Sequence, residues 1–175
     1  AQEIASEYGL HKDDCILFLG RIVPEKGVHY LIEAFRKLDT DKKLVIAGGA
    51  SDSTEYYEQI KQMAAQDPRI ILTGFVQGRM LQELYSNAYI YVLPSDLEGM
   101  PMSLLEAMSY GNCCLTSDIA ECAEVVGDKA ASFAHGSADA LYEALQDLVQ
   151  HPQKVQEYKD QAADFITGKF SWDSV

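Results

Sequence analysis

Two cations follow a glycine in the segment Gly20-Arg21-Ile22-Val23-Pro24-Glu25-Lys26-Gly27. Gly20 has no Cβ, so the backbone can come close to a ligand at that position. Arg21 offers a planar fork of N–H donors that suits phosphate oxygens, and Lys26 adds a second positive charge. The segment is therefore a candidate site for a phosphate group. The alternative is a solvated turn in which Arg21 and Lys26 pair with nearby carboxylates.

A second candidate for anion binding lies within residues 94–108. Pro101 suits the first turn of a helix, where its missing N–H costs nothing. The backbone amides of Met102, Ser103 and Leu104 would then face a ligand, because the first N–H groups of a helix have no partner within it. Gly99 provides a sharp turn and open space directly before the helix. These residues predict a helix N-terminus that binds phosphate.

Two carboxylates, Glu98 and Glu106, flank this helix start. Glu106 shares a helix face with Met102, four residues earlier, and we expect the opposite, core-facing side to carry Leu104, Leu105 and Met108. A carboxylate there can accept hydrogen bonds from the two vicinal hydroxyls of a ribose. Glu98 lies ahead of the helix, where it is free to receive hydroxyls from a second sugar. The alternative is that both acids complement the helix dipole.

Two glycine-containing segments complete the set. In Gly74-Phe75-Val76-Gln77-Gly78, Phe75 and Val76 would line a flat pocket for a nucleobase, or would be ordinary core residues. Gly48 and Gly49 allow a close approach of the backbone to a ligand, or form a plain tight turn.

All these segments follow short apolar runs that are typical of buried strands, at residues 16–19, 43–47, 70–72, 89–93 and 113–116, with a sixth run at 131–133. Helical patterns alternate with them, at residues 28–38, 56–63, 81–85, 104–108, 141–149 and after Pro152. This alternation predicts an α/β fold, a Rossmann-like three-layer α/β/α domain with a parallel sheet of about six strands. Such sheets bind ligands beyond the carboxyl ends of their strands, where the candidate segments lie.

Composition narrows the class of function. The 175 residues correspond to one domain, and 14 Lys and Arg against 27 Asp and Glu give a net charge of −13. This charge argues against binding to nucleic acid or to an acidic membrane surface. No GxGxxG segment follows the first strand and no GxxxxGK[ST] segment occurs, which argues against NAD-dependent chemistry and NTP hydrolysis.

Cysteine and histidine spacing predicts no metal site. Cys15, Cys113, Cys114 and Cys122 form no CxxC pair and keep no ligand spacing with the four histidines. We expect reduced thiols that pack as small apolar groups. No apolar run approaches the ~20 residues that span a bilayer, and the first residues do not resemble a signal peptide.

Taken in order, the motifs resemble the C-terminal, donor-binding domain of retaining glycosyltransferases with the GT-B fold, specifically glycosyltransferase family 4. The resemblance runs from about residue 13 to the end of the chain. Its most specific part is Glu98-x7-Glu106 within Pro94-Ser95…Glu98-Gly99…Leu105-Glu106-Ala107-Met108. The other matching motifs are Gly20-Arg21…Lys26-Gly27, Val45-Ile46-Ala47-Gly48-Gly49, Gly74-Phe75-Val76, Leu84-Tyr85-Ser86-Asn87-Ala88 and the ending Phe170-Ser171-Trp172.

The resemblance implies a role for each candidate residue. The donor's diphosphate would be held by Gly20, Arg21, Lys26, Met102 and Ser103. Glu106 would bind the ribose, and the base would lie against Phe75 and Val76. The transferred sugar would contact Glu98, the candidate catalytic residue, together with Gly99, Met100 and Pro101. Met100-Pro101 stands where the family often has Phe-Gly, which removes an aromatic wall and leaves the choice of sugar open.

The implied reaction is transfer of a hexose from a nucleotide diphosphate sugar, UDP-sugar ahead of GDP-sugar, to a glycan or lipid-linked acceptor. It would need no metal or cofactor. Residues 1–175 would form a single donor-binding domain, inactive alone, and the N-terminal acceptor domain would precede Ala1 in the full protein. We expect a cytoplasmic protein, or one at the inner face of the membrane with any membrane contact made by the absent domain.

Three alternatives remain open at this point: half of a sugar-nucleotide epimerase, a non-catalytic nucleotide-sugar binding module, and a flavodoxin-like or receiver-type module. A receiver needs an acidic cluster with a phosphoacceptor Asp at the end of the first strand, where Gly20-Arg21 stands instead.

Overall fold

The computed structural model describes residues 2–50 and 54–170. Residues 51–53, shortly after the Gly48-Gly49 pair, and the Ser171-Trp172 part of the final motif lie outside this range. Six parallel strands form one sheet in the order β3-β2-β1-β4-β5-β6. Their bounds are β1 Cys15–Leu19, β2 Lys43–Ala47, β3 Ile70–Gly74, β4 Ile90–Leu93, β5 Cys114–Ser117 and β6 Ala131–Phe133. The predicted parallel sheet of about six strands is confirmed.

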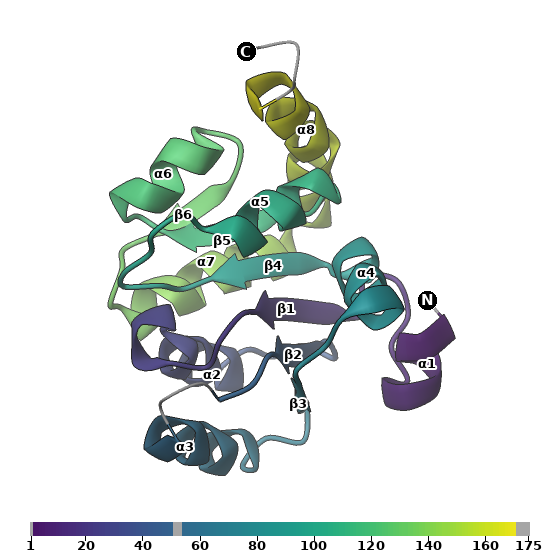
Figure 1. Ribbon diagram of the computed structural model, residues 1–175, viewed down its shortest axis with the longest axis vertical. Helices are drawn as coiled ribbons and strands as arrows, with labels where there is room; N and C mark the ends of the chain where they lie inside the picture. The colour runs from purple at the N-terminus through teal and green to yellow at the C-terminus, as the bar shows by residue number, and fades with distance from the viewer. Residues whose placement is uncertain (1, 51–53, 171–175) are drawn as a thin grey trace.

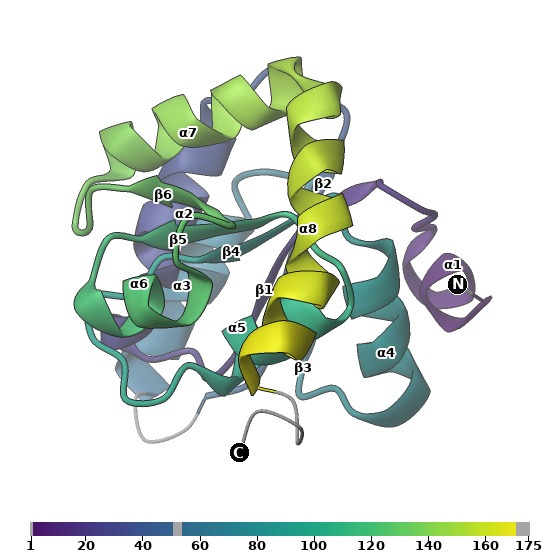
Figure 2. The same ribbon diagram turned by 90° about the horizontal axis from the view of Figure 1, so that it is seen from above.

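Helices cover both faces of the sheet (Figures 1 and 2). They are α1 Gln2–Tyr8, α2 Val28–Arg36, α3 Thr54–Ala64, α4 Gly78–Asn87, α5 Met102–Ser109, α6 Ala120–Val126, α7 Ala138–Gln150 and α8 Pro152–Phe170, with a 3₁₀ turn η1 at Pro24–Lys26. One face carries α2 packed against α7 and α3, and the other carries α5 packed against α8 and α6, with α1 beside α4. This is the predicted three-layer α/β/α arrangement.

Burial explains why these segments form these elements. The strands β1, β2, β4 and β5 are apolar runs with nearly every residue buried, as expected for a sheet covered on both faces. On α2, Val28, Leu31, Ile32 and Phe35 are all inaccessible to solvent, which makes one continuous apolar stripe. Each such side chain contributes about 1.5–3 kcal/mol when it leaves water. Sheet and stripes together form one core.

Two helices were not predicted. The helix α6 has seven residues, of which Cys122, Val125 and Val126 are buried, and the helical patterns of the sequence do not include it. The helix α1 also has seven residues and buries only Ile4. Helices of two turns contain too few apolar positions to reveal a period of 3.6 residues. Tertiary packing therefore decides that these segments are helical.

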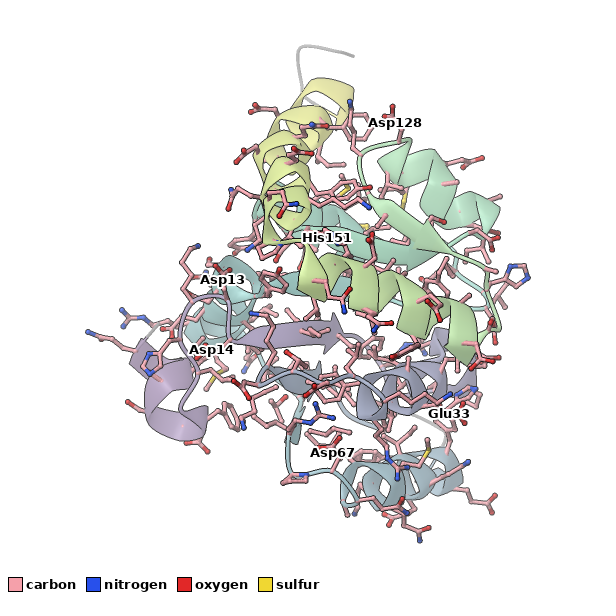
Figure 3. All side chains as sticks on the ribbon, turned by 180° about the vertical axis from the view of Figure 1, so that it is seen from behind. Asp13, Asp14, Glu33, Asp67, Asp128 and His151 are labelled. Atoms are coloured by element: carbon pink, nitrogen blue, oxygen red, sulfur yellow. The ribbon has the colours of Figure 1, made fainter. Side chains whose placement is uncertain are left out.

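The acidic surplus is distributed over the surface rather than gathered at one place. Figure 3 labels Asp13 and Asp14 before β1, Glu33 on α2 and Asp128 after α6. Within residues 2–50 and 54–170, no helix combines the length and the apolar character that crossing a membrane requires.

Candidate functional site

The loops after β1 and β2 are pressed together at the carboxyl edge of the sheet. The Gly20 amide donates to Ala47 O at 3.0 Å, and the Ile22 amide donates to Gly49 O at 3.1 Å. A Cβ at Gly48, where φ is +145°, would overlap Gly20 O. Only glycine allows this approach, so the structure gives Gly48 a specific role that its sequence context left open.

The loop after β1 also packs on the loop after β4, because these two strands are neighbours in the sheet. The Asp96 amide donates to Glu25 O at 2.8 Å, which ties η1 to the segment between β4 and α5. Gly27 ends η1 with φ +72°, and a Cβ there would overlap Pro94 O. In Figure 1 these strands end on the left, beside the turn that leads into α2. The two candidate anion sites therefore come together at one edge.

A buried ion pair forms where these loops meet. Lys26 Nζ lies 2.7 Å from Glu98 Oε2, and the Glu98 side chain is only 3% exposed. The Ser95 hydroxyl donates to the same oxygen at 2.6 Å. Glu98 was expected to be free for sugar hydroxyls, and the structure instead engages one of its two oxygens. Lys26 does pair with a carboxylate, as the alternative interpretation of its loop held, but that carboxylate is the predicted sugar-binding residue.

Arg21 differs from Lys26 in this respect. It is exposed, and among the described residues no carboxylate forms a salt bridge with it. It lies beside a cavity of about 220 Å³ that is lined by residues 19–21, 47–49 and 75–76. The cavity brings together Gly20, Arg21, Phe75 and Val76, which come from two loops far apart in the sequence. Phe75 is 76% exposed, so it is not a core residue.

At the N-terminus of α5, nearby backbone carbonyls accept hydrogen bonds from two of the three amides that were expected to bind a ligand. The helix α5 begins at Met102, one residue later than predicted, with Pro101 directly before it. The Met102 amide donates to Met100 O at 2.9 Å and the Leu104 amide donates to Pro101 O at 3.1 Å. Of the three amides expected to face a ligand, only that of Ser103 has no acceptor among the described residues. The tight turn at Met100 accounts for this difference.

Two tyrosines, neither of them a predicted site residue, form hydrogen bonds to Ser103 at the start of α5. Tyr91 OH, on the fully buried β4, lies 2.6 Å from Ser103 Oγ. Tyr85 OH, from α4, donates to Ser103 O at 3.3 Å. Burial raises the pKa of Tyr85 far above its usual value, and the nearby Glu106 carboxylate adds to that rise. Tyr85 therefore lies beside the candidate ribose-binding carboxylate, and the Leu84-Tyr85 motif was the signal that could have identified it.

The α5 surface follows the predicted division with one exception. Met102 and Glu106 are exposed, while Leu104 and Met108 are buried. Leu105, expected on the core-facing side, is only partly buried. Exposed apolar side chains gather around the turn before α5, where Leu97, Met100 and Met102 are each more than half exposed. Gly99 has open space around its Cα, so this turn remains accessible.

The thiols are buried, and Cys122 lies close enough to Glu98 and Ser117 for both to affect its pKa. All four cysteines are free and buried, as predicted. Burial raises the pKa of Cys15, Cys113 and Cys122 to about 12. Across the described ranges, no cluster of three or more His, Cys, Asp and Glu side chains could hold a metal ion.

Comparison with curated proteins reveals similar sequences. The chain is 31% identical over 169 residues to an alpha-maltose-1-phosphate synthase of Mycobacterium tuberculosis, a match that covers 89% of this chain and 44% of that protein. It is 26% identical over 174 residues to an alpha-D-kanosaminyltransferase of Streptomyces kanamyceticus, covering 97% of this chain and 45% of that one. The chain therefore spans less than half the length of these relatives.

Solved structures share the fold at lower identity. Anabaena Alr3699/HepE, crystallised in complex with UDP and glucose, superposes with a TM-score of 0.87 at 18% identity, over 96% of this chain and 47% of that one. The C-terminal domain of a glycosyl transferase group 1 family protein (LpcC) from Francisella tularensis superposes with a TM-score of 0.82 at 22% identity, over 96% of this chain and 91% of that domain.

A protein family described as glycosyl transferases group 1 matches residues 2–165. The match includes every strand of the sheet and all the candidate site residues. The chain belongs to the family of glycosyl transferases group 1.

Proposed function

We propose that this chain is the donor-binding half of a retaining glycosyltransferase that transfers a hexose from a nucleotide diphosphate sugar to a glycan or lipid-linked acceptor. The observation that carries the proposal is the cavity at the carboxyl edge, which gathers Gly20, Arg21, Phe75 and Val76. The cavity has an apolar wall beside a cation, which complements the flat face and the negative charge of a nucleobase joined to a diphosphate.

In this proposal the donor lies along the carboxyl ends of the strands. The base occupies the cavity against Phe75 and Val76, and the ribose hydroxyls donate to Glu106. Arg21 and Lys26 hold the diphosphate, and the Ser103 amide, which has no acceptor among the described residues, would donate to a phosphate oxygen. UDP is our first choice of nucleotide, since the Anabaena structure of the same fold holds UDP.

The proposed catalysis is electrostatic. Negative charge grows on the diphosphate as the bond to the sugar breaks, and the cations Arg21 and Lys26 stabilise that charge without a metal ion. Glu98 places the sugar, with one carboxylate oxygen held by Lys26 and Ser95 and the other available to a sugar hydroxyl. Leaving-group departure and attack on the same face of the sugar would retain the anomeric configuration.

The acceptor would bind to a second domain. Because the relatives are more than twice as long as the matched region, we place the acceptor-binding half in the remainder of a longer polypeptide. We also propose that the protein is cytoplasmic and that any contact with a membrane is made by the acceptor-binding half. The exposed Leu97, Met100 and Met102 around the start of α5 would then lie at the mouth of the cleft between the halves.

Calorimetric titration with uridine, guanosine, adenosine and their diphosphates tests the proposal. We expect Glu106→Ala to weaken nucleoside and nucleotide alike, and Arg21→Ala to weaken only the phosphorylated ligands. Lys61→Ala, which removes an exposed cation from α3, is the matched control and should change neither. Absence of binding by any nucleotide, or an Arg21→Ala variant with unchanged affinity for the diphosphate, would contradict the assignment.

A further inference from the structure

Two buried serines, Ser95 and Ser117, lie behind the Lys26–Glu98 ion pair. The Ser117 hydroxyl, at the end of β5, donates to Ser95 O at 2.6 Å. The Ser95 hydroxyl donates to Glu98 Oε2 at 2.6 Å, and Lys26 Nζ donates to the same oxygen at 2.7 Å. Ser95 is fully buried and Ser117 is 1% exposed. The pair is thus connected through two hydrogen bonds to the neighbouring strand of the sheet.

The two carboxylate oxygens of Glu98 differ in their hydrogen bonds. Oε2 accepts from both Ser95 and Lys26, and both bonds have the short length of charge-assisted hydrogen bonds. Oε1 accepts no hydrogen bond from the described residues, and it is not fully buried, so it remains open to a ligand. A carboxylate held through one oxygen keeps a fixed orientation and leaves the other oxygen for a ligand that donates an O–H group.

A lysine side chain is flexible, so a hydrogen-bonded carboxylate is needed to keep its ammonium in one position. Its four methylene groups have free rotation, and holding the ammonium in one place costs rotamer entropy of up to ~2 kcal/mol. The Lys26 side chain is 18% exposed, so its ammonium could move into solvent if the Glu98 carboxylate turned away. A cation fixed before a ligand arrives binds that ligand more tightly, because the ordering cost has already been met in folding.

We propose that Ser95 is a positioning residue: Ser117 holds its backbone carbonyl, and the Ser95 hydroxyl fixes the Glu98 carboxylate and thereby holds the Lys26 ammonium in place for the diphosphate. This inference rests on the proposed function for the identity of the ligand. It assigns to Ser95 no contact with the donor itself. Its effect is transmitted through Glu98 and Lys26.

The test compares Ser95→Ala with Tyr89→Phe. The control also removes one buried hydroxyl, which donates to Leu148 O at 3.1 Å, but Tyr89 lies just before β4, at the opposite edge of the sheet from the site. The first measurement is the rate at which an N-hydroxysuccinimide ester of acetic acid acetylates Lys26, read by peptide mass spectrometry relative to the exposed Lys61. The second is the ratio of the dissociation constants of nucleoside and nucleoside diphosphate, for the base that binds the unmodified chain.

We expect Ser95→Ala to raise the relative acetylation of Lys26 three- to tenfold and to lower the affinity ratio by a similar factor, with nucleoside binding changed less than twofold. Tyr89→Phe should leave both quantities unchanged. Ser117→Ala should shift both in the same direction by a smaller factor, and it replaces Ser95→Ala if that variant does not fold by circular dichroism.

Unchanged acetylation in Ser95→Ala, or an equal rise in Tyr89→Phe, would overturn the inference. A loss of nucleoside and diphosphate affinity by the same factor would also overturn it, because that result indicates a purely structural role. If the unmodified chain binds no nucleotide, the proposed function fails separately, and acetylation alone then decides whether Ser95 holds Lys26.

Discussion

Replacing Gly27 with alanine tests the contact that brings the loops after β1 and β4 together. Gly27 has φ +72°, and a Cβ there would overlap Pro94 O and also lie 2.9 Å from the Tyr30 ring. The backbone of Pro94 cannot turn aside as a flexible side chain would. The loops must therefore separate until the Cβ and the carbonyl oxygen reach ordinary contact, at about 3.3 Å.

Two costs make up the expected loss. Alanine in the left-handed conformation costs about 1–2 kcal/mol wherever it occurs. Separating the loops weakens the hydrogen bond from Asp96 N to Glu25 O and the Lys26–Glu98 pair, which contribute about 1 and 1.5–3 kcal/mol. We expect Gly27→Ala to lower the free energy of unfolding by about 3–6 kcal/mol, a large part of the stability of a typical domain.

Gly9→Ala separates the cost of the left-handed conformation from the cost of moving the loops apart. Gly9 has nearly the same φ, +68°, and an added Cβ meets nothing within 4 Å. That variant should lose only about 1–2 kcal/mol. Urea unfolding followed by circular dichroism measures both variants, and the difference between them is the cost of separating the loops. A Gly27→Ala variant no less stable than Gly9→Ala would refute the packing of these loops and the geometry of the site that depends on it.

Three further outcomes follow from individual contacts. Nuclear magnetic resonance should find the pKa of His135 above 6.5, because Asp118 hydrogen-bonds to its ring, and Asp118→Asn should return it to the usual value. A raised folded-state pKa stabilises the fold below the unfolded pKa of His135, so this contribution should disappear as pH rises through the folded pKa and be missing in Asp118→Asn. Tyr91→Phe removes the hydrogen bond to Ser103 and should cost about 1 kcal/mol in urea unfolding, and no loss would show that the bond is unimportant. Iodoacetamide should modify none of the four buried cysteines in the folded chain, as mass spectrometry can check, and rapid modification would contradict their burial.

The strands were predictable because each is a short apolar run between glycine-containing or polar loops. The predicted runs 16–19 and 70–72 differ from β1 and β3 by one or two residues at one end. Continuous apolar character requires cover on both faces, which in turn implies a parallel sheet with crossover helices. The short helices α1 and α6 escaped prediction because packing, rather than periodicity, makes them helical.

The candidate site was predictable only as a set of loops. Arg21, Lys26, Glu98 and Glu106 were identified by residue type and by their position after strands. Their partners were not, because the Lys26–Glu98 pair joins residues 72 positions apart. Tyr91 and Tyr85 likewise contact Ser103 from two other elements.

The sequence by itself thus determined the parallel α/β fold and the edge of the sheet where a ligand would bind, because both depend on local patterns of apolar residues and turns. The tertiary structure alone decided that β4 lies beside β1, and with it that Glu98 pairs with Lys26 while Arg21 has no salt-bridge partner among the described residues. The order of strands in the sheet is a property of the whole core, and no short segment of the chain encodes it.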